Sequence, residues 1–199
     1  MRKFLLLTAI AAGVVGLVSF APAGGDDKGK QDKPKLDVPY VPTDEDTVRA
    51  MLKLAAVKEG DTVFDLGCGD GRIVISAVKD FKAKKGLGID IDPARLKDCE
   101  ERVKSEKLSN EQIKKLTFKE GNILKMTPED FKDVDVVTLY LFPEINLKLK
   151  PILQKGLKPG ARVVSHAFHM GEDWEPEKTQ RVEPRGTTIY LWTIKEVKK

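Results

Sequence analysis

The stretch that decides the fold is residues 62–72, which read TVFDLGCGDGR. Its first half, residues 62–66, is rich in β-branched and aromatic residues and predicts a short buried strand. The second half has glycines at 67, 69 and 71, which let the backbone turn sharply and approach a ligand with no Cβ in between. Apolar residues then recur at helical spacing and predict a helix over residues 72–81.

The same alternation of strand and helix continues in both directions from this stretch. An earlier helix is expected to begin at Thr43, with the Thr43 side chain as its N-cap, and Asp92 with Pro93 is expected to begin another. The predicted strands cover 86–91, 116–119, 134–139 and 161–165, the later helices cover 92–107 and 146–156, and 180–183 with 187–195 form an antiparallel pair. This order predicts an α/β domain, with a mainly parallel sheet and helices on both faces.

The spacing of the glycine loop distinguishes between nucleotide cofactors. A dinucleotide fingerprint reads G-x-G-x-x-G, whereas residues 67–71 read G-x-G-x-G and Asp65 stands two positions before Gly67. A carboxylate at that position would repel a pyrophosphate, but it suits a cofactor that carries a cationic amino group. The pattern therefore favours S-adenosylmethionine, which has an ammonium and a sulfonium group.

Two further motifs follow predicted strands, where ligands bind in such sheets. Asp90 ends the second strand and is placed to accept the two ribose hydroxyls. Asp92 competes for that role, but it fits better as the N-cap before Pro93. Asn122 and Ile123 follow the third strand, where Asn122 can bond the adenine amino group and Ile123 can cover the ring; a turn residue with a local side-chain bond explains Asn122 almost as well.

These motifs resemble those of the class I methyltransferases. The resemblance covers residues 38–195 and rests on DLGCGDGR (65–72), GIDID (88–92) and EGN (120–122). It implies a Rossmann-like, seven-stranded sheet whose last strand is antiparallel. It also implies that Asp65, Gly67 and Gly69 meet the methionine moiety, that Asp90 takes the ribose, that Asn122 and Ile123 frame adenine, and that Tyr40 lies over the cofactor.

A narrower resemblance points to an acceptor. PYVPT (39–43), VVTLYL (136–141) and RVVSH (162–166) are similar to segments of the small archaeal protein-lysine methyltransferases and of their mitochondrial relatives, which act on lysines of inner-membrane proteins. This resemblance implies transfer of a methyl group to a lysine amine of a protein. Methylation of a small molecule or lipid-linked acceptor, and a cofactor-binding module without turnover, remain open alternatives.

Tyr140 is the candidate catalytic residue on the acceptor side. With Phe142 it can form an aromatic wall that guides a lysine chain by apolar and cation–π contact, although packing explains both rings equally well. His166 and His169 have no identifiable acid partner, so neither is assigned as a base; we expect His166 to be a polar strand end and His169 a solvated loop residue.

The N-terminus predicts export or tethering to a membrane. Arg2 and Lys3 precede the uncharged, mostly apolar run 4–20, and a small-x-small triplet at 21–23 suits signal peptidase. Residues 1–23 are therefore interpreted as a signal peptide or membrane anchor, 24–37 as a disordered linker and 38–199 as the methyltransferase domain. The domain is expected outside the cytoplasm, where it contacts a membrane only through 4–20 and only if the signal stays uncleaved.

Composition argues against several other classes. The net charge of +4 falls to +2 without Arg2 and Lys3, and no basic stripe with interleaved aromatics supports nucleic-acid binding. Cys68 and Cys99 form neither a zinc spacing nor a disulfide framework, so we expect two free thiols and no metal site. The expected partner is a protein substrate, and the expected state is a monomer.

Overall fold

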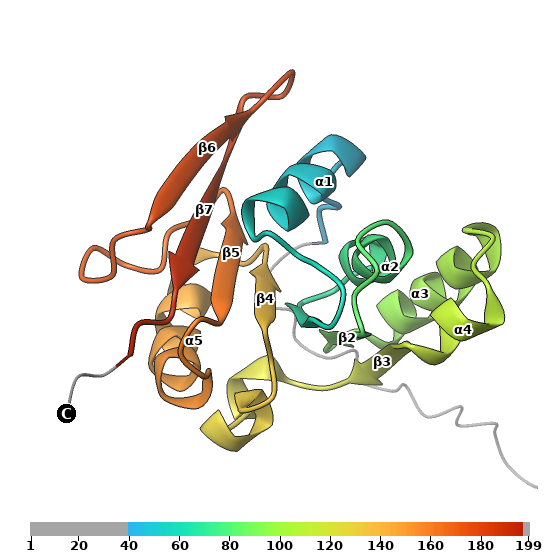
Figure 1. Cartoon of the computed structure of the whole chain (residues 1–199), viewed down its shortest axis with the longest axis horizontal. Coiled ribbons are helices and arrows are strands. Elements are labelled where there is room, and N and C mark those ends of the chain that lie inside the picture. Colours follow the sequence, from blue (N-terminus) through green and yellow to red (C-terminus); the bar gives the residue numbers. More distant parts are fainter. Residues whose placement is uncertain (1–39, 197–199) are drawn as a thin grey trace, which may run out of the picture. The chain divides into compact units, whose positions relative to one another are not determined.

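The computed structural model describes residues 40–196. These residues form an α/β domain around a seven-stranded sheet (Figure 1). The predicted signal or anchor at 1–23 and the predicted linker at 24–37 lie outside the described residues. Among residues 40–196, no helix is both long and apolar enough to cross a bilayer.

The sheet has the topology that the sequence predicts. In spatial order its strands are β3 (Leu116–Glu120), β2 (Lys85–Asp90), β1 (Thr62–Leu66), β4 (Val136–Leu139), β5 (Arg162–His166), β7 (Thr187–Thr193) and β6 (Lys178–Val182). The first five are mutually parallel, while β7 is antiparallel to both β5 and β6. Strand order reverses between β1 and β4, and in open α/β sheets ligands bind at such a point. The predicted fold class, with its antiparallel last strand, is confirmed.

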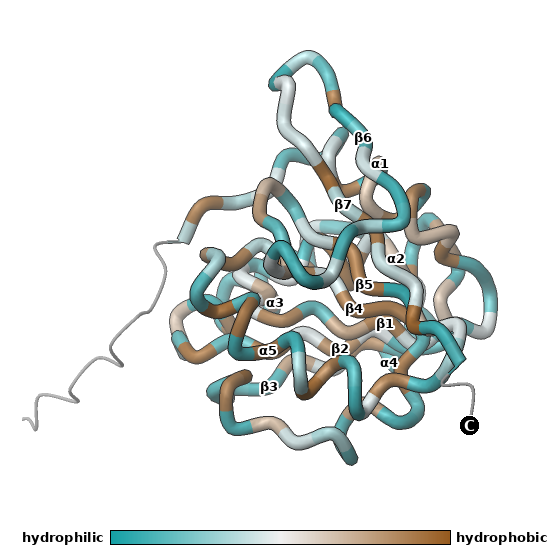
Figure 2. Tube along the Cα trace, turned by 90° about the vertical axis from the view of Figure 1, so that its left-hand side faces the viewer, coloured by the Kyte–Doolittle hydropathy of each residue, from teal (hydrophilic) through white to brown (hydrophobic). Residues whose placement is uncertain are grey.

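Helices cover both faces of this sheet. The helices α1 (Glu45–Leu54), α2 (Arg72–Lys79) and α3 (Pro93–Ser105) lie on one face, and α5 (Pro143–Gly156) lies on the other with the short 3-10 helices η1 (Ile123–Lys125) and η2 (Pro128–Phe131) (Figure 1). Side chains alternate along β4, so that Val136 packs with α1 and α2 while Val137 packs with α5. Hydrophobic residues accordingly gather along the central strands (Figure 2).

Two helix starts differ from the sequence prediction. The N-cap of α1 is Asp44, whose carboxylate accepts the Thr47 N–H at 3.0 Å, so the assignment of Thr43 as N-cap was wrong. Thr43 instead turns its hydroxyl toward β5. Helix α5 begins at Pro143 rather than at Asn146, because a proline with its fixed φ fits the first helical turn. The predicted cap of α3 is confirmed, since Asp92 accepts the Ala94 N–H at 2.9 Å.

Candidate functional site

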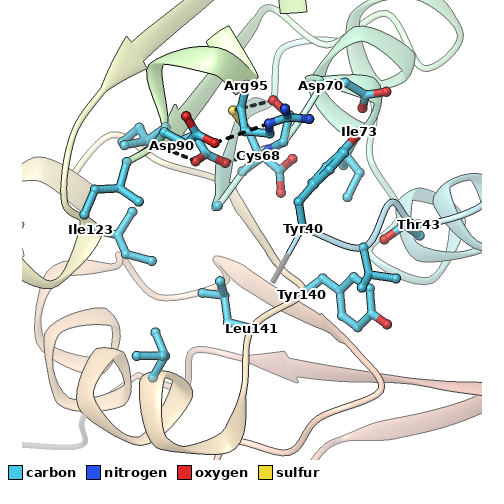
Figure 3. A pocket seen from close by; sticks show the side chains of 18 of the residues that line it. Tyr40, Thr43, Cys68, Asp70, Ile73, Asp90, Arg95, Ile123, Tyr140 and Leu141 are labelled. Carbon is cyan, nitrogen blue, oxygen red and sulfur yellow. Dashed lines mark hydrogen bonds and ion pairs between the residues drawn. The ribbon is translucent and has the colours of Figure 1, made fainter. Parts of the chain in front are cut away.

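A pocket opens at the carboxyl ends of β1, β2 and β4 (Figure 3). All eight residues singled out from the sequence line it: Tyr40, Asp65, Gly67, Gly69, Asp90, Asn122, Ile123 and Tyr140. Figure 3 shows Asp90 and Ile123 on one side of the pocket and Tyr40 with Tyr140 on the other. Residues separated by 100 positions in the chain therefore meet at one site.

The glycine loop is held in a fixed shape by the end of β2. Gly67 and Gly69 have φ values of +79° and +54°, a backbone conformation that residues with a Cβ rarely adopt. The N–H groups of Gly67 and Cys68 both donate to the Ile89 carbonyl, at 2.8 and 3.0 Å. The Gly69 N–H donates to the Asp90 carboxylate at 2.8 Å. The loop backbone is thus preformed around the pocket.

Asp65 is a buried carboxyl at the floor of the pocket. It lies opposite Thr138 in the parallel β1–β4 register, and the Thr138 hydroxyl donates to it at 2.7 Å. Thr138 is therefore turned into the sheet toward Asp65 and not toward an acceptor. Burial, reinforced by the nearby carboxylates of Asp90 and Asp70, raises the pKa of Asp65 to about 7. Among residues 40–196, no cationic side chain pairs with the ionised form of this carboxyl.

Asp90 and Asn122 form the opposite wall. The Asp90 carboxylate accepts the Asp92 N–H at 3.0 Å as well as the Gly69 N–H, so its position is fixed from two directions. The Asn122 side-chain oxygen accepts the Leu124 N–H at 2.9 Å and caps η1. This local bond is the one that the turn interpretation of Asn122 expected. A carbonyl oxygen has a second lone pair, so the bond leaves room for a ligand donor.

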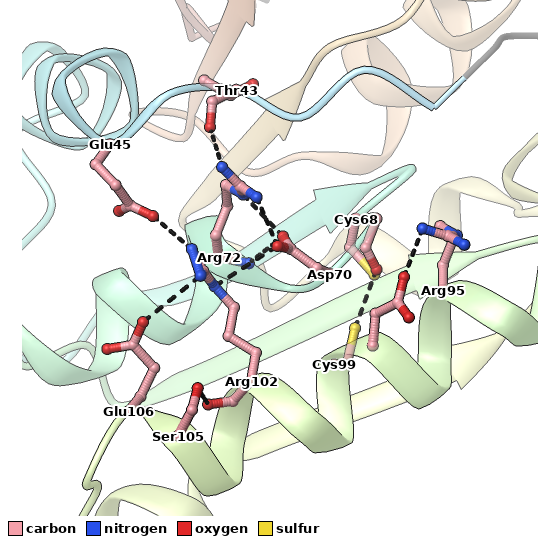
Figure 4. A network of polar contacts seen from close by, with 12 residues as sticks. Thr43, Glu45, Cys68, Asp70, Arg72, Arg95, Cys99, Arg102, Ser105 and Glu106 are labelled. Atoms are coloured by element: carbon pink, nitrogen blue, oxygen red, sulfur yellow. Dashed lines mark hydrogen bonds and ion pairs between the residues drawn. The ribbon is translucent and has the colours of Figure 1, made fainter.

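The segment before α1, residues 40–43, lies against the glycine loop, and we call it the strap. A Cβ at Gly69 would lie 2.4 Å from the Tyr40 ring, so the ring packs directly on the loop backbone. The Arg95 guanidinium lies 4.5 Å from the centre of the same ring. The Arg72 side chain bridges strap and loop, because it donates to the Thr43 carbonyl at 2.7 Å and to Asp70 (Figure 4).

Aromatic rings form the wall at the end of β4. The Tyr140 ring stacks on the His166 imidazole with centroids 3.8 Å apart, and Phe168 lies 6.2 Å from Tyr140. Phe142 meets Phe168 edge-on at 5.7 Å and is 38% exposed at the pocket mouth. Burial lowers the pKa of His166 to about 4, opposed only by the charge of Asp44, so the imidazole is neutral at neutral pH.

Both histidines are more engaged than the sequence indicated. His166 is a buried strand end whose two ring nitrogens bond threonine hydroxyls. His169 was expected in a solvated loop, but it is half-buried and packs edge-on against Tyr190 and Trp192. Both rings are placed by tertiary contacts with β7.

Cys68 and Cys99 are free and buried. The Cys99 thiol donates to the Gly69 carbonyl at 3.1 Å, so α3 supports the glycine loop from behind. Within residues 40–196, the acidic, histidine and cysteine side chains form no cluster of three that could hold a metal ion.

Sequence reasoning missed three residues that shape the pocket. Arg72 and Arg95 fix the strap, but arginines at helix starts are common and give no signal of this role. Phe168 follows β5 in the chain and lies near Tyr140 only because β5 pairs with β4 in the sheet, so no local sequence pattern indicates this contact. The Asp-Gly-Arg sequence at 70–72, at the end of the glycine loop, was the one visible hint of the Asp70–Arg72 bridge.

Comparison with known proteins agrees with this geometry. Residues 65–178 match the family model of the ANTKMT methyltransferase domain. A protein-lysine N-methyltransferase from Saccharolobus islandicus (strain REY15A) is 41% identical over 163 residues, covering 81% of this chain and 96% of that protein. A ribosomal protein L11 methyltransferase from Clostridium botulinum is 35% identical over 132 residues, 66% of this chain and 39% of that protein.

A solved structure extends the likeness to the fold. The structure described as an RNA methyltransferase from Salinibacter ruber in complex with S-adenosyl-L-homocysteine is 43% identical, with a TM-score of 0.70 over 80% of this chain and 97% of that one. The family model covers more than half of the chain, and the Saccharolobus relative aligns over nearly its whole length. This chain therefore belongs to the ANTKMT methyltransferase domain family and is an S-adenosylmethionine-dependent methyltransferase.

Proposed function

We propose that the enzyme transfers the methyl group of S-adenosylmethionine to the side-chain amine of a protein lysine. The observation that carries the proposal is the wall of Tyr140, Phe142 and Phe168 beside the cofactor pocket. Such a wall suits the four-carbon stem of lysine, and its ring faces attract an approaching cation. The name of the Saccharolobus relative supports the same acceptor.

The proposed roles of the cofactor residues follow from their positions. Asp65 pairs with the cofactor ammonium, and the backbone of Gly67 and Gly69 lies along the methionine moiety. Asp90 accepts the ribose hydroxyls with the lone pairs that its two backbone bonds leave free. Asn122 and Ile123 frame the adenine, and Tyr40 covers the cofactor from the strap.

The chemistry needs little covalent help from the protein. The cofactor supplies an already activated methyl group, so the chain must align the lysine amine in line with the breaking carbon–sulfur bond and exclude water. The amine attacks with its lone pair and must therefore arrive without its third proton. The ring faces attract the ammonium only as it approaches; once the amine is surrounded by apolar surface and separated from water, desolvation favours the neutral form.

A pH dependence follows from the raised pKa of Asp65. The cofactor ammonium favours the carboxylate, whereas Asp65 in the free enzyme is partly protonated near pH 7. Lowering the pH from 7 to 5 should therefore weaken cofactor binding by up to about tenfold per pH unit. Calorimetry across this range in two buffers of different ionisation enthalpy measures the proton release; an affinity that is flat from pH 5 to 8 would contradict the role.

Replacing Tyr140 tests the acceptor wall. Tyr140→Ala should raise the KM for the protein acceptor roughly tenfold, the scale of a lost cation–π contact, while the cofactor Kd stays near wild type. Tyr140→Phe should keep most of the activity because its ring face survives. Tyr190→Ala removes a half-buried ring outside the pocket and is the control. If Phe harms transfer as much as Ala does, the hydroxyl and not the ring acts on the acceptor.

RNA is a second candidate acceptor, because the Salinibacter structure is described as an RNA methyltransferase. The enzyme is incubated with labelled S-adenosylmethionine and whole-cell extract, and separate portions of the product are treated with proteinase, with ribonuclease or with organic solvent. We expect label that proteinase removes and ribonuclease leaves. Label lost to ribonuclease, or extracted by organic solvent, would replace the protein acceptor with RNA or with a lipid-linked acceptor, and no label would indicate binding without turnover.

We propose further that the chain is exported or tethered through its N-terminus. The basic start and apolar run at residues 1–23 support this location. Sequencing the N-terminus of protein from the native host should find a start after Ala23, or Met1 in a membrane fraction. A Met1 start in wholly soluble cytosolic protein would contradict both versions.

A further inference from the structure

His166 is the point at which three separate parts of the domain meet. Its Nδ1 lies 3.0 Å from the Thr43 hydroxyl of the strap, and its Nε2 lies 2.9 Å from the Thr187 hydroxyl at the start of β7. Its ring face stacks on Tyr140. Every polar atom and one face of this buried side chain are therefore engaged.

The contacts of His166 connect the two halves of the site. Thr43 is joined to the glycine loop through Arg72, which bonds the Thr43 carbonyl and the Asp70 carboxylate. Tyr140 belongs to the aromatic wall, which lines the same pocket beside the strap. A continuous path therefore runs from the glycine loop through the strap and His166 to Tyr140, over contacts of 4 Å or less.

We propose that His166 is a positioning residue with two separable tasks. Its ring nitrogen holds the strap, and hence Tyr40, over the cofactor, while its ring plane sets the orientation of Tyr140 toward the acceptor. This inference rests on the proposed roles of the strap and of Tyr140. It assigns His166 no contact with substrate and no transfer of a proton.

The surroundings of His166 disfavour the role of a base. Both ring nitrogens already bond hydroxyls, so neither is free to face an acceptor amine. The side chain is 6% exposed, and within residues 40–196 it hydrogen-bonds no carboxylate; Asp44 influences it only through its charge. Hydroxyl groups donate or accept equally well, so the neutral ring satisfies both threonines in either tautomer.

Two substitutions separate the two tasks. His166→Phe keeps a flat ring beneath Tyr140 but removes both hydrogen bonds. It should raise the cofactor Kd about fivefold, the scale of one lost hydrogen bond, with the acceptor KM near wild type. His166→Asn places an amide near the Nδ1 position and removes the ring. It should leave the cofactor Kd near wild type and raise the acceptor KM about fivefold, the scale of a lost ring stack.

Variants of the threonines serve as controls that leave the imidazole in place. Thr43→Val removes the strap bond from the other side and should reproduce the effect of His166→Phe on the cofactor Kd. Thr187→Val keeps both the strap bond and the ring stack, so the cofactor Kd and the acceptor KM should both stay within about twofold of wild type. If His166→Phe fails to fold, Thr43→Val still tests the strap task.

The experiment uses the full-length chain, with calorimetry for the cofactor; for the acceptor, the initial rate of methyl-label transfer into whole-cell extract protein is measured at several extract concentrations. The expected result is a crossed pattern, with Phe affecting the cofactor and Asn affecting the acceptor. The inference would be overturned if His166→Phe and His166→Asn each raised the cofactor Kd and the acceptor KM equally, or if neither variant changed either constant. If Tyr140→Ala itself leaves the acceptor KM unchanged, the proposed acceptor wall fails, whereas a Tyr140 effect without an effect of His166→Asn removes only the role of His166.

Discussion

Asp65→Asn is expected to make the free enzyme more stable and to remove most of its affinity for S-adenosylmethionine. The fold buries this carboxyl with a threonine hydroxyl as its hydrogen-bond donor, and the described part of the chain places no cation beside it. The folded pKa of about 7 lies above the ordinary value of 3.8, so the free enzyme loses stability as the pH rises from about 4 to about 7. Asparagine removes this cost and can still accept the Thr138 hydroxyl.

The gain in stability and the loss of cofactor affinity are both measured on the Asp65→Asn protein. At pH 7.5 the melting temperature of the free variant should rise by roughly 2 °C or more. The cofactor Kd should increase roughly 10- to 100-fold, the scale of a lost bond between charged groups. The gain in melting temperature should shrink at pH 5, where wild-type Asp65 is mostly protonated.

Asp61→Asn is the matched control, because Asp61 is equally buried but lies at the other end of β1. Asp61 pairs with Arg162 at 3.0 Å, so removal of its charge leaves a partly buried guanidinium without its charged partner. This variant should lose stability and keep its cofactor affinity, the opposite of Asp65→Asn on both counts. An Asp65→Asn protein that melts lower and binds normally would show that Asp65 is only a structural carboxylate.

Gly69→Ala is expected to have the second largest effect, a weakening of cofactor binding by roughly tenfold or more. The new Cβ would lie 2.4 Å from Cε2 of Tyr40, a distance that no packed pair of carbons tolerates. Tyr40 is 41% exposed, so its ring can swing away and the strap leaves the loop. The positive φ adds roughly 1 kcal/mol of strain.

Gly60→Ala separates strain from clash. Gly60 also has a positive φ, of +93°, but a Cβ there meets nothing within 4 Å. Both variants should melt lower than wild type, and only Gly69→Ala should raise the cofactor Kd. In the Tyr40→Ala background, Gly69→Ala should cause little further increase in the cofactor Kd, because the clash with the Tyr40 ring is gone. Full additivity of the two substitutions would mean that the loop acts on the cofactor independently of Tyr40.

Much of the fold was predictable because its signals are local. The TVFDL strand, the glycine loop and the Asp92–Pro93 helix start each carry their pattern within a few residues. The five-residue helix α4 (Asn110–Lys114) was missed, although Ser109 and Gln112 show a capping-box spacing that the structure uses. Thr43 was misassigned because a threonine before three acids resembles a cap, and its true partner, His166, is 123 positions away.

In the candidate site too, the features that depend on local sequence were predictable and those that depend on tertiary packing were not. Asp65, Asp90 and Asn122 lie at or just after the carboxyl ends of parallel strands, so the order of strands alone brings them to one edge. The bond from Thr138 to Asp65 depends on the β1–β4 register, and the stack of Tyr140 on His166 depends on β4–β5 pairing and on the strap. No sequence pattern specifies these, because each is set by side-chain packing between distant segments.

Mass spectrometry that locates the methyl group on the product tests the central claim most directly. Full-length wild type and Asp65→Asn are incubated with S-adenosylmethionine and extract proteins, and modified peptides and nucleotides are both sequenced. We expect the methyl group on lysine Nζ in the wild-type reaction, greatly reduced with Asp65→Asn. Methylation confined to nucleotides or to other side chains, or lysine methylation that persists undiminished in the variant, would contradict the account.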